Sequence, residues 1–183
     1  ARGSFALVVF LVLLIGAASG FVTAWLAVER NPGFDRLRLG VWEAHPSEGT
    51  READPYSAAT HARTGRVPLA GGEGLLFLAE TDTLGAALDP ACDYAITGQA
   101  APARLWTLVA LDDAMRLVET GHPRQALTSR QILRAPDGSF TVTAAPRARP
   151  GNWLPTAPGA DGLVLALRLY DTPLTTGTGV ANV

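Results

Sequence analysis

One uncharged apolar stretch, Phe5 to Val28, constrains the fold of this chain more than any other feature. It contains no proline, and Ser19 and Thr23 are its only polar side chains. As an α-helix it would be about 36 Å long, which exceeds the hydrocarbon core of a bilayer, roughly 30 Å thick. We therefore expect residues 1–30 to form a transmembrane anchor that holds a globular domain at the lipid bilayer.

The anchor is expected to remain attached to the domain. A cleaved signal peptide has an apolar core of about 7–15 residues and small residues at its cleavage site, whereas Trp25 makes the end of this longer segment bulky. Gly16 and Gly20 form a GxxxG motif with Ser19 between them, and such a flat face lets another helix approach closely. Small residues are also common in membrane spans, so the motif alone is equally compatible with no partner helix.

The charges beside the anchor give a first orientation. Arg2 is the only basic residue before the stretch, while Arg30, Arg36 and Arg38 follow it. Under the positive-inside rule this count places the domain in the cytoplasm. Because the chain starts at Ala1 without a methionine, we expect further residues before it, and the count is then incomplete.

The composition limits what the domain can bind. The 183-residue chain has a net charge of -2, so it lacks the basic surface that nucleic-acid binding requires. All 15 basic residues are arginine, which we attribute to coding bias in a GC-rich genome. The single cysteine, Cys92, excludes an internal disulfide and any metal site built from several cysteines.

After the anchor the sequence predicts one short helix. Asp54 can cap it, Pro55 suits its first turn and Gly65 ends it, so we expect a helix over residues 54–65. One face of this helix would carry Tyr56, Ala59 and either Ala62 or Arg63.

The remaining pattern predicts strands. Alternating or apolar segments cover 37–41, 74–80, 92–97, 104–111, 140–144 and 162–170, and turn signals such as Asp137-Gly138 lie between them. Many short strands are typical of an antiparallel sandwich or jelly roll. We predict a mainly β fold with an anchor (1–30), a juxtamembrane connector (31–53), a β domain (54–174) and a tail (175–183), loosely held from Thr172 onwards.

Short motifs along the domain resemble those of a bacterial family, domain of unknown function 1214 (DUF1214), in its short form with one N-terminal membrane helix. The pair NWLP (152–155) and LRLYDTP (167–173) carries most of the resemblance. Supporting motifs are GVW (40–42), DPYSAA (54–59), ARTG (62–65), CDY (92–94) with Gly98, ARLWTL (103–108) and DGS (137–139). In longer relatives a separate domain often precedes this one, and we expect this chain to lack it.

The resemblance implies a mostly β domain, an origin in Gram-negative bacteria, and no agreed activity. It also implies an exported or envelope protein. On that ground we expect the domain to lie in the periplasm, anchored in the inner (cytoplasmic) membrane. This differs from the cytoplasmic location that the count of arginines beside the anchor indicates.

Six residues are candidates for a cleft. Arg168 interrupts an apolar strand and could bind an anion, although the plainer interpretation is that it bonds carbonyls of the NWLP loop. Trp153 in that loop could line a pocket, or cover one end of the core while Asn152 satisfies its own turn. The full set of candidates is Arg104, Trp106, Asn152, Trp153, Arg168 and Tyr170.

Signals for catalysis and metal binding are weak. His45, His61 and His122 show no metal-ligand spacing, and His61 is expected at the surface of its helix. No GxSxG or phosphate-binding loop occurs, and Cys92 is expected to pack as a small hydrophobic residue. The sequence therefore predicts no catalytic residue, no metal site and no cofactor.

Three hypotheses remain. In the first, the chain is a non-catalytic accessory subunit that docks through Gly16, Ser19 and Gly20 on transmembrane helices of a larger complex; a respiratory or photosynthetic complex of a proteobacterium is one candidate host. In the second, it is a tethered periplasmic ligand-binding or enzymatic sandwich with a cleft near Arg168 and Trp153. In the third, Trp106 or Trp153 is an exposed platform for glycans.

Overall fold

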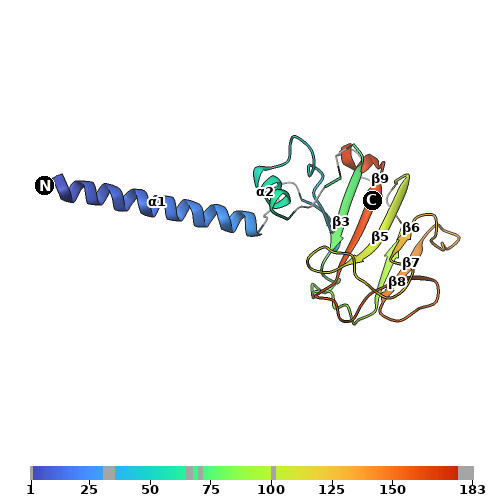
Figure 1. Ribbon diagram of the computed structural model, residues 1–183. Helices are drawn as coiled ribbons and strands as arrows, with labels where there is room; N and C mark the ends of the chain where they lie inside the picture. The colour runs from blue at the N-terminus through green and yellow to red at the C-terminus, as the bar shows by residue number, and fades with distance from the viewer. Residues whose placement is uncertain (1, 31–35, 65–67, 70–71, 100–101, 177–183) are drawn as a thin grey trace.

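A long helix, α1 (Arg2–Arg30), extends away from a β domain (Figure 1). The computed structural model describes residues 2–30, 36–64, 68–69, 72–99 and 102–176. Within α1, residues Gly3–Glu29 are long and apolar enough to cross a membrane; the most apolar 18-residue window has a mean hydropathy of 2.7, and no part of that window is buried. The helix therefore has the length and composition of a membrane anchor and packs into no aqueous core.

The domain contains two β-sheets. The larger is antiparallel with strand order β1-β2-β3-β9-β5-β6, and the smaller has the order β4-β7-β8. The strands are β1 (Leu37–Leu39), β2 (Trp42–Ala44), β3 (Gly74–Ala79), β4 (Tyr94–Gly98), β5 (Leu105–Leu111), β6 (Ala126–Thr128), β7 (Phe140–Ala145), β8 (Asn152–Pro155) and β9 (Val164–Tyr170). The predicted mainly β fold with antiparallel sheets is confirmed.

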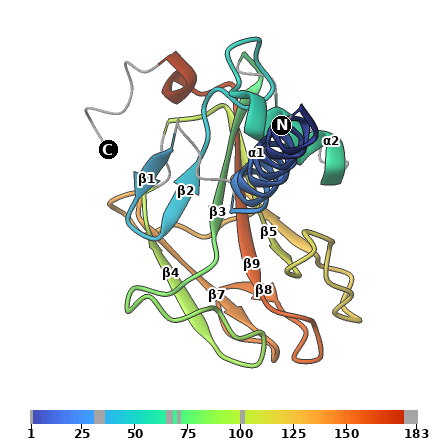
Figure 2. The same cartoon turned by 90° about the vertical axis from the view of Figure 1, so that its left-hand side faces the viewer.

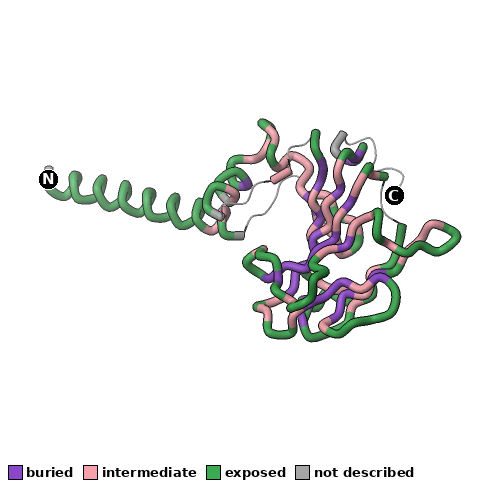
Figure 3. Tube along the Cα trace, turned by 45° about the vertical axis from the view of Figure 1, so that its right-hand side comes forward, coloured by how far each residue is buried: buried purple, intermediate pink, exposed green. Residues whose placement is uncertain are grey.

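The core lies where the two sheets meet (Figure 3). Strand alternation places every second residue of β5 in this core, beginning with Trp106, while the residues between them face the other way. The larger sheet contributes Leu75, Phe77, Trp106, Leu108, Leu165 and Leu169, and the smaller sheet contributes Val142, Ala144 and Leu154. The outer face of the larger sheet carries a second, smaller apolar cluster of Val109, Leu111, Val164 and Ala166.

The NWLP segment is a strand, β8, where the sequence predicted a loop. It pairs in parallel with β7, with Val142 opposite Asn152 and Ala144 opposite Leu154. Parallel pairing across so short a connection is an exception in an otherwise antiparallel domain. The prediction was wrong because a segment with Asn, Trp and Pro has turn character when its strand partner is unknown.

The segment predicted as a connector also contributes to the domain. Strands β1 and β2 pair with each other, and β2 pairs with β3, so they extend one edge of the larger sheet. Trp42 is half-buried and packs against the core cluster.

Helix α2 (Pro55–Thr64) begins after Asp54, as the cap and proline predict. A 3-10 helix, Pro173–Thr176, follows β9, and Leu174 within it is 2% exposed. The expectation that the chain is loosely held from Thr172 onwards is therefore wrong for residues 172–174; residues 177–183 lie outside the described part. Cys92, predicted to pack inside, is exposed in a turn before β4.

Candidate functional site

The Gly16–Gly20 face of α1 is open. A Cβ atom added at either glycine would have no neighbour within 4 Å apart from the helix backbone. The Ser19 hydroxyl donates to the Gly16 carbonyl (3.1 Å), and the Thr23 hydroxyl donates to the carbonyls of Ser19 (2.9 Å) and Gly20 (3.0 Å). Because both hydroxyls are bonded to their own helix, this surface is small and smooth and suits close packing against another helix.

The last turn of α1 is tied to α2. The Arg63 guanidinium donates to the Glu29 carboxylate at 2.5 Å, across 34 positions of the sequence. Both side chains are about half exposed, so the pair contributes little to stability and acts mainly on orientation. It is one of the contacts through which the anchor meets the domain.

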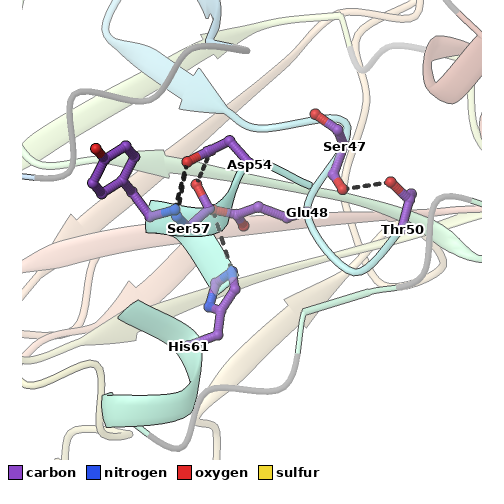
Figure 4. A network of polar contacts seen from close by, with 7 residues as sticks. Ser47, Glu48, Thr50, Asp54, Ser57 and His61 are labelled. Carbon is purple, nitrogen blue, oxygen red and sulfur yellow. Dashed lines mark hydrogen bonds and ion pairs between the residues drawn. The ribbon is translucent and has the colours of Figure 1, made fainter. Parts of the chain in front are cut away.

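The N-terminus of α2 is capped by Asp54 (Figure 4). One carboxylate oxygen accepts the N–H groups of Tyr56 (2.9 Å) and Ser57 (3.0 Å), and the other accepts the Ser57 hydroxyl at 2.5 Å. These hydrogen bonds, that of the Ser57 hydroxyl first, lower the pKa of Asp54. The Ser57 hydroxyl is therefore used in the cap and donates to no histidine base, so it is not arranged as a nucleophile.

His61 faces inward beside Ser57, one turn further along α2. Its Nε2 lies 3.5 Å from the Glu48 carboxylate, and the two side chains are 16% and 19% exposed. Neither ring nitrogen makes a hydrogen bond within the described part of the chain. The prediction that His61 lies at the surface is wrong, because the 45–50 loop folds over this side of α2 (Figure 4).

These polar groups form no metal site or ligand cavity. Across residues that the structure describes, no three His, Cys, Asp or Glu side chains are placed to hold a metal ion together. The narrow cavity beside Asp54, Ser57 and His45 has no room for a water molecule. The network therefore joins α2 to the 45–50 loop.

A wider cavity of about 680 Å³ lies between the loops 112–119 and 157–161. Its charged lining residues include Asp112, Arg116 and Asp161. Asp112 accepts the Arg116 N–H (2.8 Å) and its Nε–H (2.8 Å), and the backbone bond is the main cause that lowers the pKa of Asp112. The cavity is open to solvent, and the Asp112 carboxylate in its lining is already paired with Arg116. No candidate residue from the sequence lines it.

The candidate cleft residues are spread over the domain. Arg168 stands opposite Leu76 and Thr107, on the outer face of the larger sheet, with Tyr170 on the same face. Trp153 lies between buried Asn152 and Leu154, so it is on the outer face of the smaller sheet. Arg168 and Trp153 are thus on opposite outer faces of the two packed sheets and line no common cleft.

Three other candidates have structural partners. Trp106 is 2% exposed and stacks on Phe140, with ring centroids 5.3 Å apart, so it is no platform for glycans. The exposed Arg104 pairs with Asp171 at 3.2 Å. Asn152 was expected to hydrogen-bond within its own turn, but it bonds to segments more distant in the sequence. Its Oδ1 accepts the Leu133 N–H, and its Nδ2 donates to the carbonyls of Leu133 and Thr141.

The arginine that bonds the NWLP segment is Arg124. Its guanidinium donates to the Trp153 carbonyl at 3.3 Å, the kind of contact expected of Arg168. The Arg168 guanidinium makes no hydrogen bond or ion pair with any described residue, and Arg168 is half-buried. The Trp153 indole N–H donates to the Ala145 carbonyl (2.9 Å), and its ring meets the His122 ring edge to face.

Comparisons with known proteins agree with this fold. The VPA0106 protein from Vibrio parahaemolyticus has a crystal structure that matches with a TM-score of 0.59 at 20% identity, over 86% of this chain and 39% of that one. An uncharacterized protein from Burkholderia cenocepacia matches with a TM-score of 0.44 at 18% identity, over 84% and 37% of the two chains. This chain thus spans about two-fifths of either protein, and the first likeness shows the fold alone.

No curated protein matches the chain. The model of one family, described as a protein of unknown function (DUF1214), matches residues 73–174. That segment runs from the start of β3 to the buried Leu174 and covers more than half of the 183 residues, so the chain belongs to the DUF1214 family.

Proposed function

We propose that this chain is a single-pass membrane-anchored envelope protein, an accessory subunit that docks through α1 on the helices of a larger integral membrane complex. The observation that carries the proposal is the open Gly16–Gly20 face on a span whose most apolar window is not buried against the domain. We propose a respiratory or photosynthetic complex as the host. The domain would lie on the periplasmic side of the inner membrane.

The geometry of α1 supports a docking face of defined direction. At 100° per residue, Gly16, Gly20 and Thr23 lie within about 60° of one another around the helix, and Ala18 lies on the opposite side. Lipid chains are as apolar as leucine, so helix association in a membrane relies on close van der Waals packing. A face of two glycines and self-bonded hydroxyls provides that packing, whereas the flanking leucines and valines do not.

The arrangement of the domain favours a role in assembly over a role in binding small molecules. Its candidate cleft residues are divided between opposite outer faces, and the Ser57 hydroxyl is engaged by Asp54. A tethered ligand-binding sandwich with a cleft at Arg168 and Trp153 receives no support from this arrangement.

The proposal is tested on the intact chain, extracted from its native membrane in a mild detergent and separated by native electrophoresis. We expect the wild-type chain to migrate within a large assembly. Gly16→Leu and Gly20→Leu should release it as a free subunit, because each places a branched side chain on the docking face. Ala18→Leu, which adds the same side chain to the opposite face, should leave the assembly intact.

Two results would overturn the proposal. One is migration of the wild-type chain as a monomer. The other is a complex of two copies only, shown by co-purification of differently tagged chains with no other protein present.

A further inference from the structure

Helix α2 has two faces that differ in burial. Ser57 and His61 form the inner face, and Ser57 is 4% exposed. The opposite face is exposed, with Tyr56 at 36%. At 100° per residue this outer face is centred on Ala59 and also carries Tyr56, Ala62 and Arg63. The inner face lies against the 45–50 loop, where His61 Nε2 is 3.5 Å from the Glu48 carboxylate, whereas the outer face is exposed.

The outer face of α2 is held close to the end of the membrane span. Residues Gly3–Glu29 form a helix about 40 Å long, roughly 10 Å longer than the hydrocarbon core. In a bilayer its ends would therefore reach the headgroup layers, with Glu29 at that depth. Because Arg63 on the outer face of α2 is bonded to Glu29 at 2.5 Å, this face would lie at the same depth in the bilayer as Glu29.

The arrangement of the domain agrees with this depth. In Figure 1, α2 lies between the end of α1 and the strands of the larger sheet. Figure 2 looks nearly along α1, and strands β3, β9 and β5 run across the view behind it. The sheet therefore lies across the axis of the anchor, and α2 is the element on the anchor side.

The chemistry of the outer face fits phospholipid headgroups. Tyrosine is enriched at membrane–water interfaces because its ring is apolar and its hydroxyl is polar. Ala59 and Ala62 keep the helix surface close to whatever lies against it. The Arg63 guanidinium has five N–H donors in a fork that matches phosphate, and a single carboxylate uses only part of them.

We infer that α2 lies in the headgroup layer of the bilayer, with the face formed by Tyr56, Ala59, Ala62 and Arg63 on phospholipid phosphates. This inference rests on the proposed membrane anchoring by α1, but not on its docking to a partner. On the inner face, the contact of His61 with Glu48 then joins the headgroup layer to the 45–50 loop that continues from β2. The helix thereby fixes how the β domain stands on the membrane.

The test uses the full chain in nanodiscs of phosphatidylethanolamine and phosphatidylglycerol, in a Cys92→Ser background. Single cysteines are introduced as Ala59→Cys, Leu84→Cys and Val22→Cys and labelled with an environment-sensitive fluorophore. Leu84 is the matched control in the domain, because it is 91% exposed in a turn after β3. Nitroxides on the lipid headgroup, or deep in the acyl chain, quench labels at the corresponding depth.

We expect headgroup nitroxides to quench the label at position 59 several-fold more than the label at position 84. Acyl-chain nitroxides should quench the label at position 22. If position 22 is quenched but position 59 resembles position 84, α1 spans the membrane while α2 stands away from it, and the inference is overturned alone. If position 22 is not quenched, both the inference and the proposed anchoring are overturned.

Discussion

The backbone of Gly74 passes so close to Leu169 that a Cβ atom on residue 74 would lie 2.2 Å from the Leu169 carbonyl oxygen. This close approach is at the start of β3, where it pairs with the end of β9 in the middle of the larger sheet. Gly74→Ala should therefore force two central strands apart and destabilise the domain by about 1–3 kcal/mol. Thermal or urea unfolding, followed by tryptophan fluorescence, measures the change.

Gly72 provides the matched control for this substitution. It lies two residues earlier, and a Cβ atom there has no neighbour within 4 Å. Gly72→Ala should change the unfolding free energy by less than about 0.5 kcal/mol. Equal effects of the two substitutions would contradict the close approach of the two strands.

The Asp54 cap predicts a pH dependence. Hydrogen bonds from Ser57 lower the pKa of Asp54 in the folded state, so this carboxylate stabilises the domain above its unfolded pKa of about 3.9. That stabilisation is lost as the pH falls through the lower, folded value. Asp54→Ala should cost about 1 kcal/mol at pH 7 because the cap is lost.

Asp54→Asn separates the cap from the charge. Asparagine is a good capping residue but does not titrate, so this variant should lose less stability than the wild-type chain when the pH is lowered from neutral into the acid range. Denaturant midpoints along this pH series provide the measurement. Parallel acid losses in the two proteins would show that Asp54 is not stabilised as a carboxylate.

Asn152 is predicted to be essential for the stability of the smaller sheet. It is 7% exposed and satisfies the Leu133 N–H (2.6 Å), the Leu133 carbonyl (2.8 Å) and the Thr141 carbonyl (3.0 Å). Asn152→Leu would leave these groups unsatisfied and cost about 2–4 kcal/mol. Removing the exposed Arg124 contact to Trp153 in Arg124→Ala should cost less than about 1 kcal/mol, and the reverse order would contradict this assignment.

The exposed and unique Cys92 reports the side of the membrane. If the domain is periplasmic, a membrane-impermeant maleimide should label Cys92 in intact spheroplasts as fully as in lysed cells. Cys92→Ser should abolish the labelling. Labelling that requires lysis would place the domain in the cytoplasm, as the arginine count beside the anchor suggests.

Local patterns in the sequence were sufficient for part of this fold. The anchor was predicted because an uncharged apolar run of this length has few alternatives. Helix α2 was placed within one residue at its start by Asp54 and Pro55, since capping depends on neighbours in sequence. The long strands β5 and β9 followed from β-rich apolar runs.

Features set by distant residues were not predictable in the same way. His61 is covered by the 45–50 loop, and β8 becomes a strand because β7 lies beside it. Cys92 is exposed because the turn that contains it remains outside the core. None of these relations leaves a periodic signal in the sequence.

The prediction of a cleft near Arg168 and Trp153 failed for a related reason. Both faces of β5 and β9 are apolar, so the sequence could not show which face meets the second sheet. The register places Trp106 and Leu169 inside and Arg168 outside. Residues that are neighbours in the motif LRLYDTP are consequently divided between two surfaces.

The most direct test of the central claim is site-specific photo-crosslinking in the native membrane, with a photoreactive amino acid at Thr23 or at Phe21. Thr23 lies on the Gly16–Gly20 face, and Phe21 points well away from it around α1. We expect a discrete protein adduct from position 23 that disappears with Gly20→Leu, and none from position 21. Adducts of equal intensity from both positions, or none from position 23, would contradict it.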